Sequence, residues 1–315
     1  MDVLTDLLQR SRARGAAFSR SRLHGDWGLQ FPVSGTLAIH AIVDGEMFAW
    51  TDDPDRSTRV LGGDVLLLRA SPHHLASAPG RPTIAFMSLL NDAGLSRPTG
   101  PSRVATLGTH ADGPAADFCC GAYLFDGDLS RPLIDALPAL VRLRPPAGSP
   151  LRLTIDLLVR EMDGDGPGQQ ALLDRLLDVA LVQALRLWFR QADDVPGWFR
   201  ATEEPGIGNA LRALHTDPTH PWTVGELARI AALSRSTFAQ RFTEVVEVPP
   251  LQYLTQWRVA LAKERLRDTG DGLAAIASSV GYSSEFSFAS AFKRQVGIAP
   301  GRWRAQHSAS RSPNS

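Results

Sequence analysis

The last third of the chain contains the same short pattern twice, and this repeat restricts the possible folds more than any other feature. In the first copy, Thr223 stands three residues before Glu226, a capping-box spacing that predicts the start of a helix. After a tight turn, Ser234 predicts the N-cap of a second helix. Apolar residues at helical spacing in this second helix predict one buried stripe, formed by Phe238, Phe242, Val245 and Val246.

The second copy repeats this arrangement. A helical pattern begins after Asp271, with apolar residues at Leu273, Ile276, Ala277 and Val280. A turn at residues 281–283 leads to a second helix from Ser284 to Val296, in which Phe288 and Phe292 face inward. Two short helices joined by a tight turn, present twice, predict two helix-turn-helix units.

A long helical pattern connects the two copies. Pro249 and Pro250 open it and it continues to Thr269, which is too long for a turn and too apolar for a loose linker. We expect a rigid helix that holds both units at a fixed separation. Such a spacing matters for DNA, because successive major-groove faces lie about 34 Å apart.

These residues carry a family resemblance. The pair of units, the two prolines, and three short motifs in the second unit resemble the DNA-binding domain of AraC/XylS-type transcription regulators. The motifs are Gly281-Tyr282-Ser283-Ser284, Phe292-Lys293-Arg294, and Gly297-Ile298-Ala299-Pro300 followed by Trp303-Arg304. The resemblance covers the last third of the chain. It implies binding to double-stranded DNA and activation of transcription through RNA polymerase.

Charge is distributed unevenly along the chain. Its formal net charge is zero, but residues 206–315 contain 13 Lys+Arg against 8 Asp+Glu, which gives this part +5 and the remainder −5. A basic half joined to an acidic half is typical of a DNA-binding module attached to a different kind of domain. We predict a sensory and dimerisation domain over residues 1–192, a linker over 193–206, a DNA-binding domain over 207–305 and a disordered tail over 306–315.

The N-terminal part has a mixed pattern, so the expected fold class is α+β multidomain. Residues 2–18 show helical spacing, and short apolar segments broken by Gly, Pro and Asp then predict the strands of a small barrel or sandwich, including 36–43, 46–51 and 65–69. Residues 91–117 suggest a mobile loop. The segment 169–191 is apolar on more than one face, which predicts packing on its own barrel and on a second subunit, as in a homodimer. Burial within one chain is the alternative.

The predicted barrel resembles the cupin-type sensory domain that precedes the DNA-binding domain in some AraC-type regulators. The matching segments are Trp27-Gly28-Leu29, Val43-Asp44-Gly45-Glu46 after His40, and Gly63-Asp64-Val65-Leu66-Leu67-Leu68 leading to Pro72-His73-His74. Metal-binding cupins place His and Glu ligands near His40, Glu46 and His74. Ile42 stands where a second His is expected, and Arg69 and Ser71 replace a usual Pro and Gly. We therefore expect no metal cofactor, and assign His40, Glu46, His74 and Cys120 to the barrel wall or to an unknown small-molecule effector.

The two cysteines, Cys119 and Cys120, are adjacent. Neighbouring side chains in a strand point to opposite faces, so no disulfide is expected between them. A thiol sensor needs a nearby cation that lowers the thiol pKa, and no Lys or His flanks this pair. A packing role is favoured over redox sensing. No apolar run is long enough to span a membrane, and no signal-peptide pattern begins the chain, which predicts a cytoplasmic location.

Candidate DNA contacts lie on the outward face of the second helix of each unit. In the first unit they are Arg235, Ser236, Ala239, Gln240 and Thr243, and in the second they are Ser284, Glu285, Phe286, Ser290, Lys293 and Arg294. Gln240 suits bidentate recognition of adenine and Glu285 suits cytosine N4. Phe286 suits a thymine methyl group, with a place in the core as the alternative. Lys293 and Arg294 suit phosphates.

Other classes of protein have less support. The chain lacks the short motifs of phosphate-binding loops, zinc peptidases and serine hydrolases. One alternative remains a metal-dependent cupin enzyme with an accessory DNA-binding tail. A second is a nucleoid-type DNA binder that responds to no effector. Ala232 occupies a turn position where the family commonly has Gly; a positive φ there would cost Ala about 1 kcal/mol.

Overall fold

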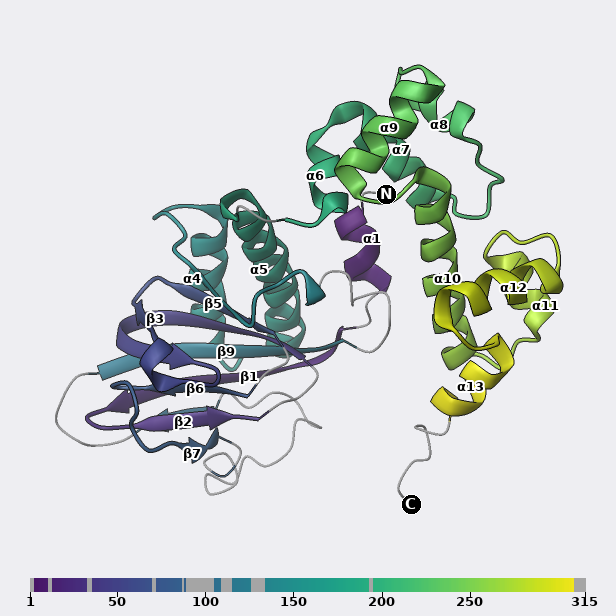
Figure 1. Ribbon diagram of the computed structural model, residues 1–315. Coiled ribbons are helices and arrows are strands. Elements are labelled where there is room, and N and C mark those ends of the chain that lie inside the picture. Colours follow the sequence, from purple (N-terminus) through teal and green to yellow (C-terminus); the bar gives the residue numbers. More distant parts are fainter. Residues whose placement is uncertain are drawn as a thin grey trace. The chain divides into compact units, whose positions relative to one another are not determined.

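The computed structural model describes residues 3–10, 13–32, 36–69, 72–86, 88, 105–108, 115–125, 134–192 and 195–308. The chain divides into two compact units. One contains residues 12–126 and 134–193 and carries the strands, and the other contains residues 1–11, 127–133 and 194–315 and is helical (Figure 1). In the described parts of the chain, no helix is long and apolar enough to span a membrane.

The first unit is built around one long strand, β3. The strands in chain order are β1 (Ala13–His24), β2 (Gly28–Phe31), β3 (Thr36–Trp50), β4 (Thr58–Leu61), β5 (Val65–Arg69), β6 (His73–Ala76), β7 (Ile84–Ala85), β8 (Ala105–Gly108), β9 (Ala115–Phe125) and β10 (Leu140–Leu143). The N-terminal half of β3 pairs with β5, and its C-terminal half pairs with β4 and β6. The strand β9 lies between β3 and β1. One sheet contains β1, β3, β5, β8, β9 and β10, and the other contains β2, β3, β4, β6 and β7. β3 therefore belongs to both sheets and connects them.

The core of this unit lies between the two sheets. Trp27 stacks on Phe118 with ring centroids 5.8 Å apart, and Phe31 stacks on Phe86 at 4.6 Å. Buried aliphatic residues from six strands complete it, namely Leu23, Leu29, Ile42, Met47, Val60, Leu66, Leu68 and Leu75. The alternation of apolar residues thus places one face of each strand inward, as predicted for a small barrel.

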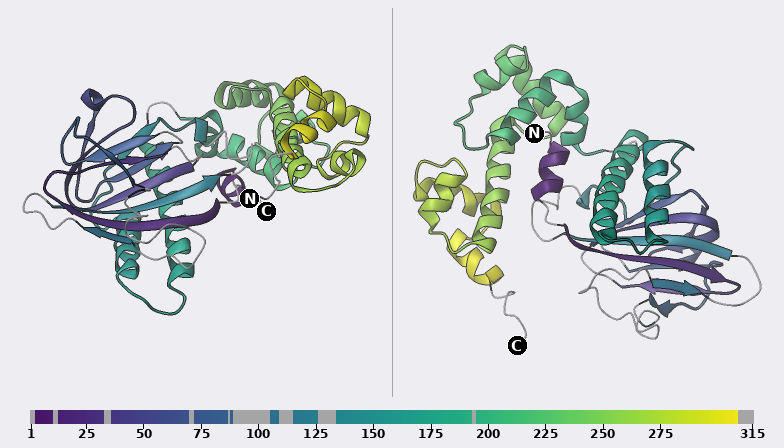
Figure 2. Two further views of the ribbon diagram at one scale, coloured as in Figure 1. Left: turned by 90° about the horizontal axis from the view of Figure 1, so that it is seen from below. Right: turned by 180° about the vertical axis from the view of Figure 1, so that it is seen from behind.

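Two helices cover the outer face of the sheet that contains β3 and β9, as the two views of Figure 2 show. They are α4 (Pro150–Met162), capped by Ser149, and α5 (Gln169–Gln191). Gly121 of β9 permits the close approach of α5, because a Cβ at this position would lie 2.7 Å from Leu177 Cδ1. The outer faces of both helices keep exposed apolar residues, at Leu153, Leu157, Leu172 and Val179.

The helical unit contains both helix-turn-helix units. Its helices are α1 (Val3–Arg10), α6 (Gly197–Glu203), α7 (Pro205–Thr216), α8 (Val224–Ile230), α9 (Arg235–Val246), α10 (Pro250–Asp268), α11 (Leu273–Ser279), α12 (Glu285–Val296) and α13 (Pro300–Ser308). The helices α8 and α9 form the first helix-turn-helix unit, and α11 and α12 form the second. The helix α10 connects the two, as predicted.

The structure differs from the predicted boundaries in three places. Part of the predicted linker, 193–206, is helix α6, because Trp198 and Ala201 are buried and Gly197 lies against the backbone of Val245. The predicted N-terminal helix ends at Arg10, and the chain then forms β1, which pairs with β9. The helix α13 continues to Ser308, into the predicted tail, whose remaining residues lie outside the described ones. Most of the loop predicted at 91–117 also lies outside them.

The helix α1 packs in the helical unit rather than with the strands that follow it. Asp6 of α1 is fully buried, and its Oδ2 lies 2.8 Å from His215 Nδ1 on α7. The other ring nitrogen of His215 lies 2.7 Å from the Tyr253 hydroxyl on α10. A carboxylate accepts hydrogen bonds only, so His215 donates to Asp6 and accepts from Tyr253 when its ring is neutral. This buried polar chain joins α1, α7 and α10.

Candidate DNA-binding surface and effector site

The local sequence of the first helix-turn-helix unit fixes its geometry. Thr223 and Glu226 form the capping box of α8, and Ser234 Oγ accepts a hydrogen bond from the Thr237 backbone to cap α9. Ala232, in the turn between the helices, has φ of 55°, the left-handed conformation anticipated for this position. The turn therefore forms with Ala in place of Gly, at a conformational cost of about 1 kcal/mol.

The helix α9 has one buried and one exposed side. Its buried residues are the predicted ones, Phe238, Phe242, Val245 and Val246. On the opposite side Arg235, Ser236 and Gln240 are exposed, while Ala239 and Thr243 are half-buried. Gln240 Nε2 donates to Glu244 Oε1 at 2.9 Å, and the Thr243 hydroxyl donates to the Ala239 carbonyl at 2.8 Å. Glu244 thus orients the Gln240 amide, whereas the hydroxyl hydrogen of Thr243 is already used.

The helix α12 presents a similar exposed side. Ser284 caps it by accepting from the Ser287 backbone, and Phe288, Ala291 and Phe292 form its buried side. The remaining predicted contact residues are all exposed: Glu285, Phe286, Ser290, Lys293 and Arg294. Phe286 is 83% exposed, so its alternative assignment to the core is wrong. A large aromatic ring held in solvent at the first turn of a recognition-type helix is a surface feature that a binding partner would cover.

Arg258 of α10 joins the two helix-turn-helix units. The sequence did not single it out. Its Nε donates to the Pro218 carbonyl at 2.6 Å and its Nη2 to the His220 carbonyl at 2.8 Å, both in the loop before α8. Its guanidinium also lies over the Tyr282 ring of the second unit, 5.6 Å from the centroid. Burial lowers the Arg258 pKa below its ordinary value. A signal was present, because a cation flanked by Trp257 and Val259 in a buried helix needs partners.

The second unit's turn contacts the same loop. Gly281 has φ of 85°, and a Cβ on it would lie 2.7 Å from Thr219 Cα and 2.8 Å from the Thr219 carbonyl oxygen. This close approach and the Arg258 contacts fix one helix-turn-helix unit against the other. α10 spans 19 residues, or about 28 Å at 1.5 Å per residue, so it separates the units on the scale of one turn of DNA.

A different set of residues lies inside the barrel. His40 Nδ1 is 2.7 Å from Cys120 Sγ, and His40 Nε2 is 2.8 Å from His73 Nε2. The three side chains are buried, and Phe31 stacks on the His73 ring at 4.8 Å. Burial and the neighbouring His73 hold the pKa of His40 well below its ordinary value, so its ring is neutral. The result is a buried polar chain across the barrel.

Only part of the predicted effector site is brought together. His40 and Cys120 meet, but Glu46 is on the surface, where Arg59 donates to both of its carboxylate oxygens at 2.6 and 2.7 Å. His74 stacks on Trp50 with centroids 5.1 Å apart and its Nδ1 lies 3.2 Å from the Thr83 hydroxyl. The inward histidine is His73, which was not singled out.

Strand geometry explains why Glu46 lies on the surface and why His73, instead of His74, faces inward. A bulge in the β3–β9 pairing between Ile42 and Asp44 reverses the alternation, so even-numbered residues face inward before it and odd-numbered residues after it. Glu46 therefore leaves the face that carries His40. The signal for His73 was the buried Leu75 two residues later, because residues i and i+2 share a face.

Neither a metal site nor a reactive thiol has positive support here. Among the residues that the structure describes, no group of three His, Cys, Asp or Glu side chains is arranged to hold a metal ion. Burial raises the pKa of Cys119 to about 12 and raises that of Cys120 further. Thiols with raised pKa values remain protonated and react slowly with oxidants, which favours the packing role for both.

The fold and the surface together define a class. Two helix-turn-helix units on one connecting helix, joined to a cupin-like barrel, form a DNA-binding transcription regulator with a separate N-terminal domain. Family models support this division: residues 2–190 match the model described as Cupin, and residues 227–306 match a helix-turn-helix domain.

Full-length relatives define the family. A putative AraC-like transcription regulator of Streptomyces antibioticus is 32% identical over 96% of this chain and 98% of its own length. The regulator AlkR of Acinetobacter baylyi is 29% identical, covering 97% of this chain and all of the relative. The activator RclR of Escherichia coli, described as specific for RCS, is 28% identical over 96% of this chain. The chain belongs to the AraC family of transcription regulators.

One solved structure illustrates the likeness in the C-terminal part. It is the DNA-binding domain of the transcription factor AdpA in complex with a target DNA. It covers 35% of this chain and 99% of its own, at 30% sequence identity and a TM-score of 0.33.

Proposed function

We propose that this regulator recognises a specific DNA sequence through α9 and α12, under the control of a signal sensed by its N-terminal unit. The observation that supports this most is the pair of capped helices whose outward sides carry unburied polar and aromatic side chains. Each helix has its Phe pair in the core, so the opposite side is available to DNA. The contacts of Arg258 and Gly281 hold the exposed sides of α9 and α12 at a fixed distance and orientation.

The contacts divide into two kinds. Gln240 recognises adenine with its amide, which Glu244 orients, and Glu285 and Phe286 contact cytosine N4 and a thymine methyl. Arg235, Lys293 and Arg294 meet phosphates, together with the backbone N–H groups at the helix N-termini. The small or half-buried residues Ser236, Ala239, Thr243, Ser284 and Ser290 allow the backbone to approach the groove.

Gln240→Ala tests the recognition role. A good bidentate contact contributes about 1–3 kcal/mol, so the Kd for a specific site should rise about 5- to 150-fold, while the Kd for random DNA at the same salt stays within about twofold. Gln191→Ala is the control, because this exposed glutamine ends α5 in the strand-containing unit. An equal loss on both DNAs would mean that Gln240 only positions the protein, and an unchanged Kd would remove it from the interface.

We further propose that the signal is a small molecule or chemical stress that acts on the barrel interior at His40 and Cys120, and that the protein activates transcription with RNA polymerase. A dimer is supported by the outer side of α4 and α5. Leu153 and Leu157 are each 53% exposed, and Leu172 and Val179 lie nearly as open. Leu157→Arg should convert a dimer to monomer in sedimentation experiments, whereas Arg186→Gln should not. A wild-type chain that is monomeric at micromolar concentration would contradict the proposal.

A further inference from the structure

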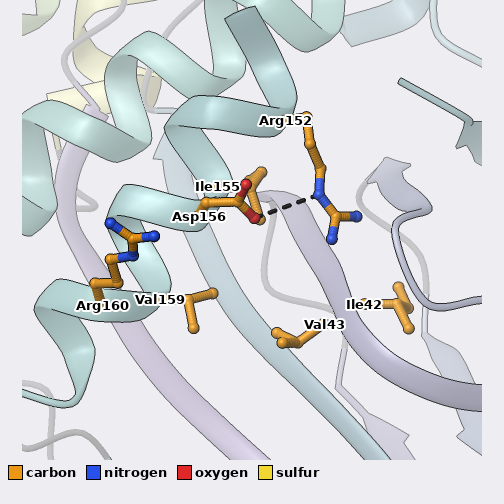
Figure 3. Close-up of a pocket in the computed structure, with 7 residues that line it drawn as sticks. All are labelled: Ile42, Val43, Arg152, Ile155, Asp156, Val159 and Arg160. Atoms are coloured by element: carbon orange, nitrogen blue, oxygen red, sulfur yellow. Dashed lines mark ion pairs between the residues drawn. The ribbon is translucent and has the colours of Figure 1, made fainter. Parts of the chain in front are cut away.

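A pocket lies between the outer face of β3 and the helix α4. It has a volume of about 180 Å³ and is lined by Ile42, Val43, Arg152, Ile155, Asp156, Val159 and Arg160. In Figure 3 the valine side chains of Val43 and Val159 form the floor, and the guanidinium groups of Arg152 and Arg160 lie at opposite ends. The pocket thus combines an apolar floor with a cationic rim. It is on the opposite side of β3 from His40 and Cys120.

The β3 bulge builds this pocket. Ile42 pairs with Phe118 and Asp44 pairs with Asp117, so Val43 is the extra residue and its side chain lies on the outer face. On α4, Ile155 and Val159 are one helical turn apart and line the pocket together with Val43. Bulges commonly re-aim a side chain beside a binding site. Val43 and Val159 both remain half-buried, so the floor is incompletely covered by the protein itself.

Among the described residues, the rim carries one ion pair and one further cation that forms none. Arg152 Nε lies 3.3 Å from Asp156 Oδ1, so these two groups neutralise each other. Arg160 is exposed and has no ion pair with any residue in the described ranges. A guanidinium binds a carboxylate through two parallel hydrogen bonds.

We propose that this pocket binds a small monocarboxylic acid with an apolar body. The carboxylate is held by Arg160 at the rim and the apolar body covers Val43, Ile155 and Val159. The volume sets the size, because a dry cavity of about 150 Å³ accommodates benzene, which implies a ligand of about six to eight heavy atoms in all. Because Arg152 is paired with Asp156, one guanidinium remains at the rim, which suits a ligand with one carboxylate. The site goes beyond the proposed function, which assigns the signal to the barrel interior.

The test uses the full-length protein, 4-methylpentanoate as the probe, and ligand-detected NMR titration without DNA. We expect saturable binding below about 10 mM, with at least about tenfold weaker binding of the neutral 4-methylpentanamide. Arg160→Gln should weaken binding of the acid about tenfold and leave the amide unchanged. Arg186→Gln, at an exposed arginine on α5, should change neither. Val159→Phe, which fills the floor, should abolish binding of both.

Three results would overturn the proposal. The first is an absence of saturable binding by the wild-type chain. The second is equal weakening by Arg160→Gln and Arg186→Gln, which would mean that only overall charge attracts the acid. The third is full binding by Val159→Phe, which would place the acid elsewhere, for example in the barrel interior. Because DNA is absent, each of these results is independent of whether the chain recognises a specific operator.

Discussion

Gly281 offers the most direct test of how the two helix-turn-helix units are held together. Replacing it by Ala introduces two separate costs. Its φ of 85° lies in the left-handed region, which costs a non-glycine residue about 1–2 kcal/mol. The new Cβ would also lie 2.7 Å from Thr219 Cα, and such overpacking costs about 1–3 kcal/mol. The free energy of unfolding should therefore fall by about 2–5 kcal/mol.

A second glycine separates the two costs. Gly297 has nearly the same φ, 86°, but nothing lies within 4 Å of the position a Cβ would take. Gly297→Ala should therefore lower the free energy of unfolding by only about 1–2 kcal/mol. Denaturant unfolding followed by Trp fluorescence measures both variants.

The two glycine substitutions should also differ in their effect on DNA binding. Because the loop at Thr219 must move away from a Cβ on residue 281, Gly281→Ala should also weaken specific DNA binding at temperatures where the protein remains folded. Gly297→Ala should bind normally. Equal destabilisation by the two substitutions would refute the reasoning, because the close approach of the two units would then contribute nothing.

Two further perturbations test other contacts. Asp6→Ala leaves the Nδ1–H of buried His215 without an acceptor and should destabilise the helical unit by about 1–3 kcal/mol, measured by denaturant unfolding; a value near zero would mean that α1 does not pack there. Cys119, whose pKa is raised to about 12, should react with iodoacetamide far more slowly in the native chain than in urea at pH 8, and its rate should keep rising with pH above 9; a native rate equal to the unfolded one would contradict its burial.

The helical half of the molecule was predictable because its local signals agree with its tertiary contacts. The capping box at Thr223, the N-caps Ser234 and Ser284, and the spacing of the Phe pairs each specify a helix and its buried side without knowledge of distant residues. What the sequence could not supply is the contact between units. Arg258 binds carbonyl oxygens some 40 positions away in the sequence, and no local pattern encodes such a partner.

The barrel was harder to predict because one irregular residue changes the assignment of every residue after it. The cupin resemblance placed His40 and Glu46 at one site, and in a regular strand these two even-numbered residues would share a face, but the bulge at Val43 reverses the faces. The Asp44-Gly45 pair was a visible signal, since Gly45 has φ of 85° and any side chain there would overlap the Ala115 carbonyl. The same bulge turns Val43 outward to the pocket beneath α4. One local departure from strand geometry therefore removes a carboxylate from the histidine side of β3 and creates an apolar floor on the other.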